Sequence, residues 1–138
     1  MTNATQPPPV TDNEVLARFI RVKDWVRADQ TVRQDAFIPP RDMNLSVTRH
    51  LGLSETELWR IGQRVVTAIA TKTKAALHGR ADITVRQVSP LQPLRTVAAP
   101  LPDNPNHAHV TAWPLDKSAR KNLAQKLALA CGKYVPAP

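Results

Sequence analysis

The first apolar positions of the chain recur with a helical period. The segment Thr11-Asp12-Asn13-Glu14 has the residue types of a capping box, which marks a helix N-terminus. The apolar residues after it are spaced as on one face of a helix: Val15, Leu16, Phe19 and Ile20. The pattern therefore predicts a first helix that follows Thr11 and ends near Lys23.

Two further segments have the same period. A second capping box, Ser54-Glu55-Thr56-Glu57, precedes an apolar stripe that consists of Leu58, Ile61, Val65 and Ile69. Gly62 lies beside this stripe and is small enough for a close backbone approach. The β-branched and Thr/Lys residues that follow favour a break or fraying within 66–74 over a helix that continues to Gly79. Asp116 and Gly132 are a suitable N-cap and C′ residue for a last helix, whose apolar residues are Ala119, Leu123, Leu127 and Ala130.

Strand patterns occupy much of the rest. Leu45–Arg49 alternates, which predicts a strand with Leu45 and Val47 towards the core, Ser46 and Thr48 on the other side, and Arg49 on the side of Leu45. Residues 107–113 predict another strand, 94–98 an edge strand, and 28–30 a turn between short extended segments. Five prolines between positions 90 and 105 exclude a long helix there. These elements predict an α+β fold, with about three helices packed on a small antiparallel sheet.

Length and composition suit a single domain. The chain has 138 residues, of which 42% are hydrophobic and 22% charged. We expect a flexible Pro-rich arm over 1–10, one domain over 11–135 and a tail over 136–138. No apolar run approaches the ~20 residues of a membrane span, and the N-terminus lacks the features of a secretory signal. Cys131 is the only cysteine, which excludes an internal disulfide framework and a multi-cysteine zinc site. We expect a cytoplasmic protein.

Positive charge is concentrated in one part of the sequence. The net charge is +8, yet residues 1–57 carry a net −1 and residues 58–138 a net +9. Such a segment attracts nucleic acid or an acidic protein surface, although many small proteins are basic merely for solubility. With 4% aromatic residues, contact with the RNA or DNA backbone is favoured over base reading. The candidate contact residues are Arg60, Arg64, Lys72, Lys74, Arg80, Lys117, Arg120, Lys121 and Lys126.

Candidate catalytic residues are fewer. His107 and His109 project from one face of a predicted strand, and His107 can act as an acid or base near neutral pH. Two histidines with Asp103 as a weak third ligand do not make a convincing metal site, so no metal or cofactor is expected. Alternatively, His107 is a strand histidine satisfied by hydrogen bonds. Ser46 lacks the surroundings of a nucleophile.

Four arginines, at positions 18, 21, 41 and 49, form a further group of candidates. Guanidinium groups bind phosphate with two hydrogen bonds, but nearby carboxylates can neutralise them. Ion pairing is favoured for Arg18. For Arg49, both a phosphate clamp and an ion pair with Glu55 or Asp42 remain open.

Several short motifs resemble a group of small bacterial proteins without an assigned activity. They are Ala36-Phe37, Leu45-Ser46-Val47-x-Arg49, Gly79-Arg80-Ala81-Asp82, Asn104-Pro105-Asn106-His107-Ala108 and Trp113-Pro114. The resemblance covers residues 15 to 130, with 66–78 as an apparent insertion. It implies no activity, but it singles out Phe37, Ser46, Arg49 and His107.

Two functions follow as hypotheses. The first is a basic binding module that contacts nucleic acid or an acidic protein partner within a larger assembly, away from membranes. The alternative is a small enzyme acting on a phosphodiester or nucleotide, with His107 as acid/base, Arg49 as phosphate clamp and Ser46 as a possible third member. The enzyme hypothesis requires Arg49 and His107 to share one cleft.

Overall fold

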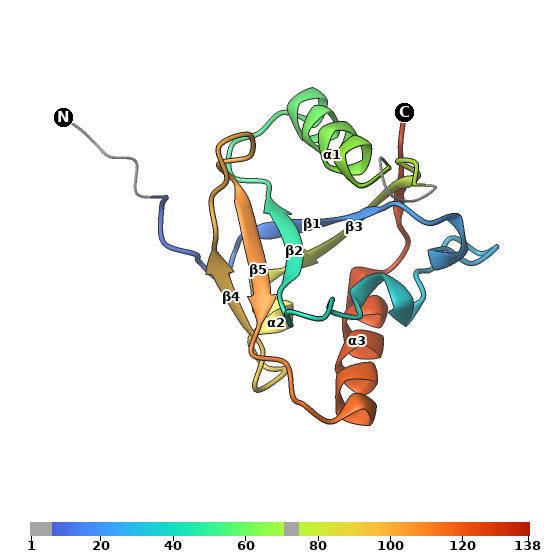
Figure 1. Ribbon diagram of the computed structural model, residues 1–138, viewed down its shortest axis with the longest axis vertical. Helices are drawn as coiled ribbons and strands as arrows, with labels where there is room; N and C mark the ends of the chain where they lie inside the picture. Colours follow the sequence, from blue (N-terminus) through green and yellow to red (C-terminus); the bar gives the residue numbers. More distant parts are fainter. Residues whose placement is uncertain (1–6, 71–74) are drawn as a thin grey trace.

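Six strands form one antiparallel sheet in the computed structural model of the chain, which describes residues 7–70 and 75–138 (Figure 1). Across the sheet the order is β4-β5-β2-β1-β3-β6. The strands are β1 (Val15–Ile20), β2 (Leu45–Arg49), β3 (Gly79–Thr84), β4 (Arg95–Ala98), β5 (His107–Thr111) and β6 (Val135–Pro136). The helices are α1 (Glu55–Ala70), α2 (Val85–Val88) and α3 (Lys117–Cys131), with 3-10 turns η1 (Lys23–Trp25) and η2 (Gln34–Phe37).

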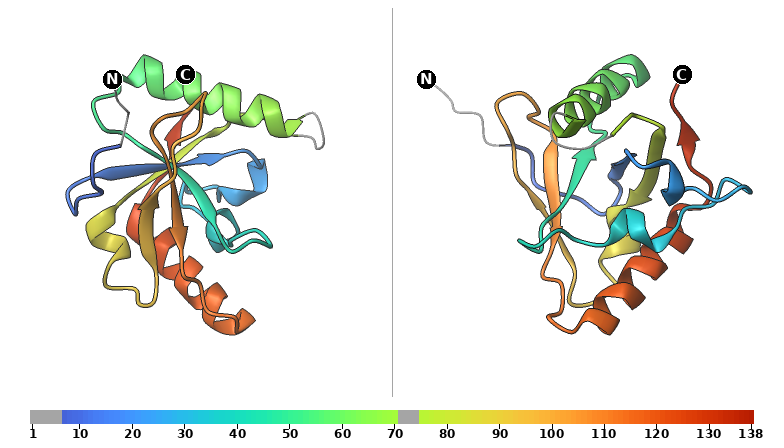
Figure 2. Two further views of the ribbon diagram at one scale, coloured as in Figure 1. Left: turned by 60° about the vertical axis from the view of Figure 1, so that its left-hand side comes forward. Right: turned by 45° about the vertical axis from the view of Figure 1, so that its right-hand side comes forward.

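The helices cover both faces of this sheet. Figures 1 and 2 show α1 over one face and α3 with α2 on the opposite side. The larger core lies between the sheet and α3, and it includes Phe37 and Leu127, both with no exposed surface. The smaller core lies under α1 and consists of Ala17, Phe19, Leu58 and Ile61. The predicted α+β class and antiparallel sheet are confirmed. None of the described helices is long and apolar enough to cross a bilayer.

The predicted first helix is wrong, because this segment forms β1. Leu16 and Ile20 face the larger core, while Ala17 and Phe19 face α1. A strand covered on both faces is apolar at neighbouring positions, so its pattern also fits a helical period. The expected bond from the Thr11 N–H to the Glu14 carboxylate does form, at 2.8 Å, but it precedes a strand.

Other expectations are confirmed. β2 has the predicted bounds, β4 is an edge strand, and Asp116 caps α3 through a 2.8 Å bond from the Ala119 N–H. α1 follows the predicted capping box and ends at Ala70, inside the expected break; residues 71–74 lie outside the described residues. β3 was not predicted. Of the predicted arm over 1–10, residues 1–6 lie outside the described residues, and Val10 packs on the larger core. The predicted tail begins at Pro136, which pairs with Gly79 of β3 as part of β6.

Gly62 allows α1 to approach β1 closely. A Cβ atom at this position would lie 2.6 Å from a ring carbon of Phe19, closer than packed atoms tolerate. The close approach that the sequence suggested is therefore present, and the partner is the Phe19 side chain. This contact sets the distance between the middle of α1 and the sheet.

Replacing Ser54 with Ala is expected to lower the free energy of unfolding by about 0.5–2 kcal/mol. The Ser54 hydroxyl accepts a 3.1 Å bond from the Glu57 N–H, and the Glu57 carboxylate accepts a 3.0 Å bond from the Ser54 N–H. Denaturant unfolding measures the change. Thr56→Ala, on an exposed residue of the same turn, is the control. Equal effects of the two substitutions would contradict a capping role for Ser54.

Candidate functional site

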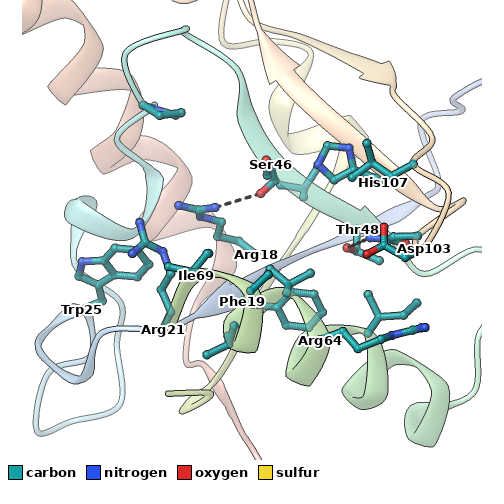
Figure 3. A pocket seen from close by; sticks show the side chains of 18 of the residues that line it. Arg18, Phe19, Arg21, Trp25, Ser46, Thr48, Arg64, Ile69, Asp103 and His107 are labelled. Carbon is teal, nitrogen blue, oxygen red and sulfur yellow. Dashed lines mark hydrogen bonds between the residues drawn. The ribbon is translucent and has the colours of Figure 1, made fainter. Parts of the chain in front are cut away.

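A cavity of about 410 Å³ lies between α1 and the sheet (Figure 3). Its volume is within the range of small-molecule binding sites. Phe19 of β1 and Ile61, Val65 and Ile69 of α1 supply apolar surface, and Leu101 adds more from the loop before β5. Val65 and Ile69 belong to the predicted core stripe, but they are only half-buried because they line this cavity.

Arg18 lies where β1 and β2 separate. The two strands pair only through Leu16 with Arg49 and Ala17 with Thr48. Beyond that point Arg18 Nε donates to the Ala36 carbonyl at 2.7 Å, and Nη1 donates to the Ser46 carbonyl at 3.1 Å (Figure 3). The guanidinium group thus bonds to a carbonyl of β2 beyond the last paired residues, and it borders the cavity.

A second arginine and a tryptophan complete this end of the cavity. The Cζ atoms of Arg18 and Arg21 lie 5.5 Å and 5.0 Å from the ring centre of Trp25, within cation–π range. Burial lowers the pKa of Arg18 to about 10, and the nearby charge of Arg21 contributes to the shift. Among the described residues, no carboxylate forms an ion pair with either arginine. We call Arg18, Arg21 and Trp25 the cationic end.

The other end of the cavity is polar. Asn104 Nδ2 donates to Thr48 Oγ1 at 3.1 Å. His107 Nδ1 lies 2.8 Å from the Ala99 carbonyl, which can only accept, so Nδ1 carries the hydrogen and Nε2 of the neutral ring is an acceptor. Asp103 also lines the cavity, and within the described part of the chain its carboxylate has no ion-pair partner. We call Thr48, Asp103, Asn104 and His107 the polar end.

The structure does not bring Arg49 and His107 together. Thr48 pairs with His107 and Ser46 pairs with His109, so these four side chains share the face towards α1. Arg49 faces the other side, as predicted, and is 1% exposed. Ser46 and His107 therefore reach the cavity, and Arg49 does not.

Arg49 forms an ion pair with a carboxylate that was not expected as its partner. Its Nε and Nη2 donate to Glu14 at 2.6 Å and 2.8 Å, and Nη2 also donates to the Pro9 carbonyl. Of the two alternatives, the structure therefore shows an ion pair, with Glu14 in place of Asp42 or Glu55. Glu55 pairs with Arg80 instead.

The predicted nucleic-acid contacts divide into several groups. Arg80 is 4% exposed, bonded to Glu55 and Asp82 and stacked on Trp59, so it is not free to bind phosphate. Arg120 donates to the carbonyls of Pro114 and Leu115. Lys72 and Lys74 lie outside the described residues. The exposed candidates are Arg60 and Arg64 on α1 and Lys117, Lys121 and Lys126 on α3. These helices lie on opposite sides of the sheet, so their exposed cations form two separate surfaces (Figure 2).

The remaining candidates add little chemistry. The ring centres of His107 and His109 are 4.8 Å apart, and burial, followed by the charge of His107, lowers the pKa of His109. No cluster of three metal-ligating side chains occurs within residues 7–70 and 75–138. Burial raises the pKa of Cys131 to about 11, which keeps it a neutral thiol.

Sequence reasoning missed the cationic end. It favoured an ion pair for Arg18 and did not single out Trp25. The sequence held no clear signal for it, because Glu14 and Asp24 lie close to Arg18 and Arg21 in the chain and fit the ion pairs that were expected. The chain matches no protein-family model, and no curated protein or solved structure matches it significantly. The resemblance to small bacterial proteins therefore stays a prediction.

Proposed function

We propose that the protein is a binding module for a phosphate-bearing ligand, whose anionic group is held at the cationic end of the α1 cavity. The observation that carries this proposal is that Arg18 and Arg21 converge there without a carboxylate partner among the described residues. Both side chains are half-buried, and withdrawing a charge from water without a counter-charge is costly. A bound anion supplies the missing partner.

Phosphate suits this end better than a single carboxylate. Arg18 uses Nε and one hydrogen of Nη1 in bonds to carbonyls, which leaves its remaining N–H groups available. The Arg21 side chain makes its cation–π contact with Trp25 and no hydrogen bond to the described residues. A phosphate group offers several oxygens and more than one negative charge, so it can accept from both guanidinium groups at once.

The exposed cations extend the proposal to nucleic acid. Arg64 lines the cavity from α1, and Arg60 lies one helical turn before it on the exposed side. A nucleic-acid strand with one phosphate in the cavity can continue across this part of α1. Its affinity should fall steeply as salt concentration rises. The lysines of α3 face the other side and are not part of this path.

We assign binding and no reaction to this site. His107 and Ser46 line the cavity, but the phosphate clamp of the enzyme hypothesis, Arg49, lies on the opposite face and is bonded to Glu14.

A titration of the full chain with pyrophosphate tests the proposal. Arg21→Gln is expected to weaken binding by roughly tenfold or more, since a charge-assisted hydrogen bond contributes about 1.5–3 kcal/mol. Calorimetry measures the affinity. Arg95→Gln, on an exposed cation of β4 that does not line the cavity, is the matched control and should bind like the wild type.

A single-stranded oligonucleotide extends the test to nucleic acid. Arg64→Gln should weaken its binding more than Arg60→Gln, because only Arg64 lines the cavity. Equal losses from Arg21→Gln and Arg95→Gln would show a diffuse surface interaction and contradict the proposal. Binding of an acidic peptide but of neither phosphate probe would identify an acidic protein partner instead.

A further inference from the structure

The geometry points to a nucleotide as the unit that the cavity accepts, with its phosphate at the cationic end and its base at the polar end, and to guanine as the preferred base. This inference rests on the proposed function and adds the identity of the bound unit. It applies equally to a free nucleotide and to one unit of a single strand.

The cavity has two chemically different ends joined by an apolar middle. Figure 3 shows Arg18, Arg21 and Trp25 on one side, Thr48, Asp103 and His107 on the other, and Phe19 between them. A nucleotide has the same order of parts, because a charged phosphate is joined through a sugar to a flat base with polar edges.

An alkyl acid fits this order less well. Its tail would cover Asp103 and His107 without offering a hydrogen bond to either. Covering polar groups without new hydrogen bonds is costly, so such a ligand loses affinity at the polar end. The polar end therefore selects a ligand whose far end is itself polar.

Two acceptors, on Asp103 and His107, are available at the polar end. The Asp103 carboxylate has no ion-pair partner among the described residues. His107 Nδ1 is bonded to the Ala99 carbonyl, so Nε2 presents a lone pair when the ring is neutral. Thr48 Oγ1 accepts from Asn104, which leaves its hydroxyl hydrogen able to donate. The edge of a ligand that meets Asp103 and His107 must donate hydrogen bonds.

Guanine is the base that presents adjacent donors. Its N1–H and its exocyclic amino group lie side by side and match the two oxygens of a carboxylate. Adenine has a lone pair at N1, which faces the carboxylate unfavourably, and cytosine lacks a ring N–H. Single-stranded bases are commonly read along this edge. Asp103 is the natural partner for guanine.

The loop that carries Asp103 is held in place. Leu101 and Asn104 exchange backbone hydrogen bonds of 3.0 Å and 3.1 Å around it. Asn104 is 3% exposed and is tied to Thr48 of β2. Little ordering of this loop is therefore needed when a base binds, which favours affinity and selectivity.

The test compares GMP, AMP and ribose 5-phosphate as ligands of the full chain, with affinities measured by calorimetry. We expect GMP to bind roughly tenfold or more tightly than AMP, because two hydrogen bonds to a carboxylate are at stake. Asp103→Asn should abolish this preference. Asp103 is exposed, so the substitution should not disturb folding. Asp12→Asn, on another exposed acid outside the cavity, is the matched control and should keep the preference.

The outcomes separate this inference from the proposed function. Equal affinities for GMP and AMP, with Arg21-dependent binding of ribose 5-phosphate, would overturn the base preference and leave the phosphate site intact. Failure of all three ligands to bind would overturn both. An oligonucleotide with one guanine that binds more tightly than GMP identifies nucleic acid as the source. Tighter binding of GMP identifies a free nucleotide, and either result supports the inference.

Discussion

Replacing Glu14 with Gln is expected to lower the free energy of unfolding by roughly 3–5 kcal/mol, the range for breaking a buried ion pair. The substitution leaves Arg49, which is 1% exposed, without its counter-charge. The side chains of Arg49 and Glu14 are only 2% and 10% exposed, so solvent cannot replace the lost interaction. Denaturant unfolding measures the change. Asp12→Asn, on an exposed acid nearby, should stay within about 0.5 kcal/mol of the wild type.

The same pair predicts a pH dependence. The hydrogen bonds from Arg49 hold the pKa of Glu14 below its ordinary value of 4.5, against the opposing effect of burial. The resulting stabilisation is fully present above pH 4.5 and is lost as the pH falls through the lower pKa of the folded state. The difference in stability between wild type and Glu14→Gln should therefore shrink on acidification below pH 4.5. A difference that does not change with pH would contradict this role of Glu14.

Replacing Leu127 with Ala is expected to lower the free energy of unfolding by about 2–5 kcal/mol. Leu127 has no exposed surface and packs in the larger core between α3 and the sheet, so its removal leaves a cavity. Leu129→Ala, on a residue of the same helix that is 75% exposed, is the matched control and should change stability by no more than about 0.5 kcal/mol. Denaturant unfolding measures both. Equal costs would mean that α3 does not dock through Leu127.

Local sequence patterns predicted two kinds of element: helices that begin with a local capping hydrogen bond, and a strand with its apolar residues on one face. The capping residues Ser54 and Asp116 and the alternating segment Leu45–Arg49 needed only sequence spacing. β1 was mistaken for a helix because both of its faces are covered, one by α1 and one by the larger core. No pattern within 15–20 distinguishes a helix from a strand with two covered faces, because both place apolar residues at neighbouring positions.

The candidate site depended on contacts between distant parts of the chain. Glu14 and Arg49 are 35 residues apart, and they meet because β1 pairs with β2. As a result, Arg49 bonds to Glu14 and does not line the cavity. The separation of the same two strands beyond Ala17 leaves Arg18 without an acidic neighbour. The alternation along β2 correctly placed Ser46 and Arg49 on opposite faces, but the strand order was needed to place Ser46 beside the arginines.

The central claim is that a phosphate-bearing ligand binds at the cationic end of the α1 cavity, and an NMR titration with pyrophosphate tests it most directly. The indole N–H signals of the three tryptophans report on three different places. Trp25 lies at the cationic end, Trp59 stacks on Arg80, and Trp113 is buried with its indole bonded to the Val110 carbonyl. The account predicts a saturable shift of the Trp25 signal, lost in Arg21→Gln, with little change at Trp59 and Trp113. Saturable shifts of signals from α3 and its lysines alone, with the Trp25 indole signal unchanged, would contradict this claim.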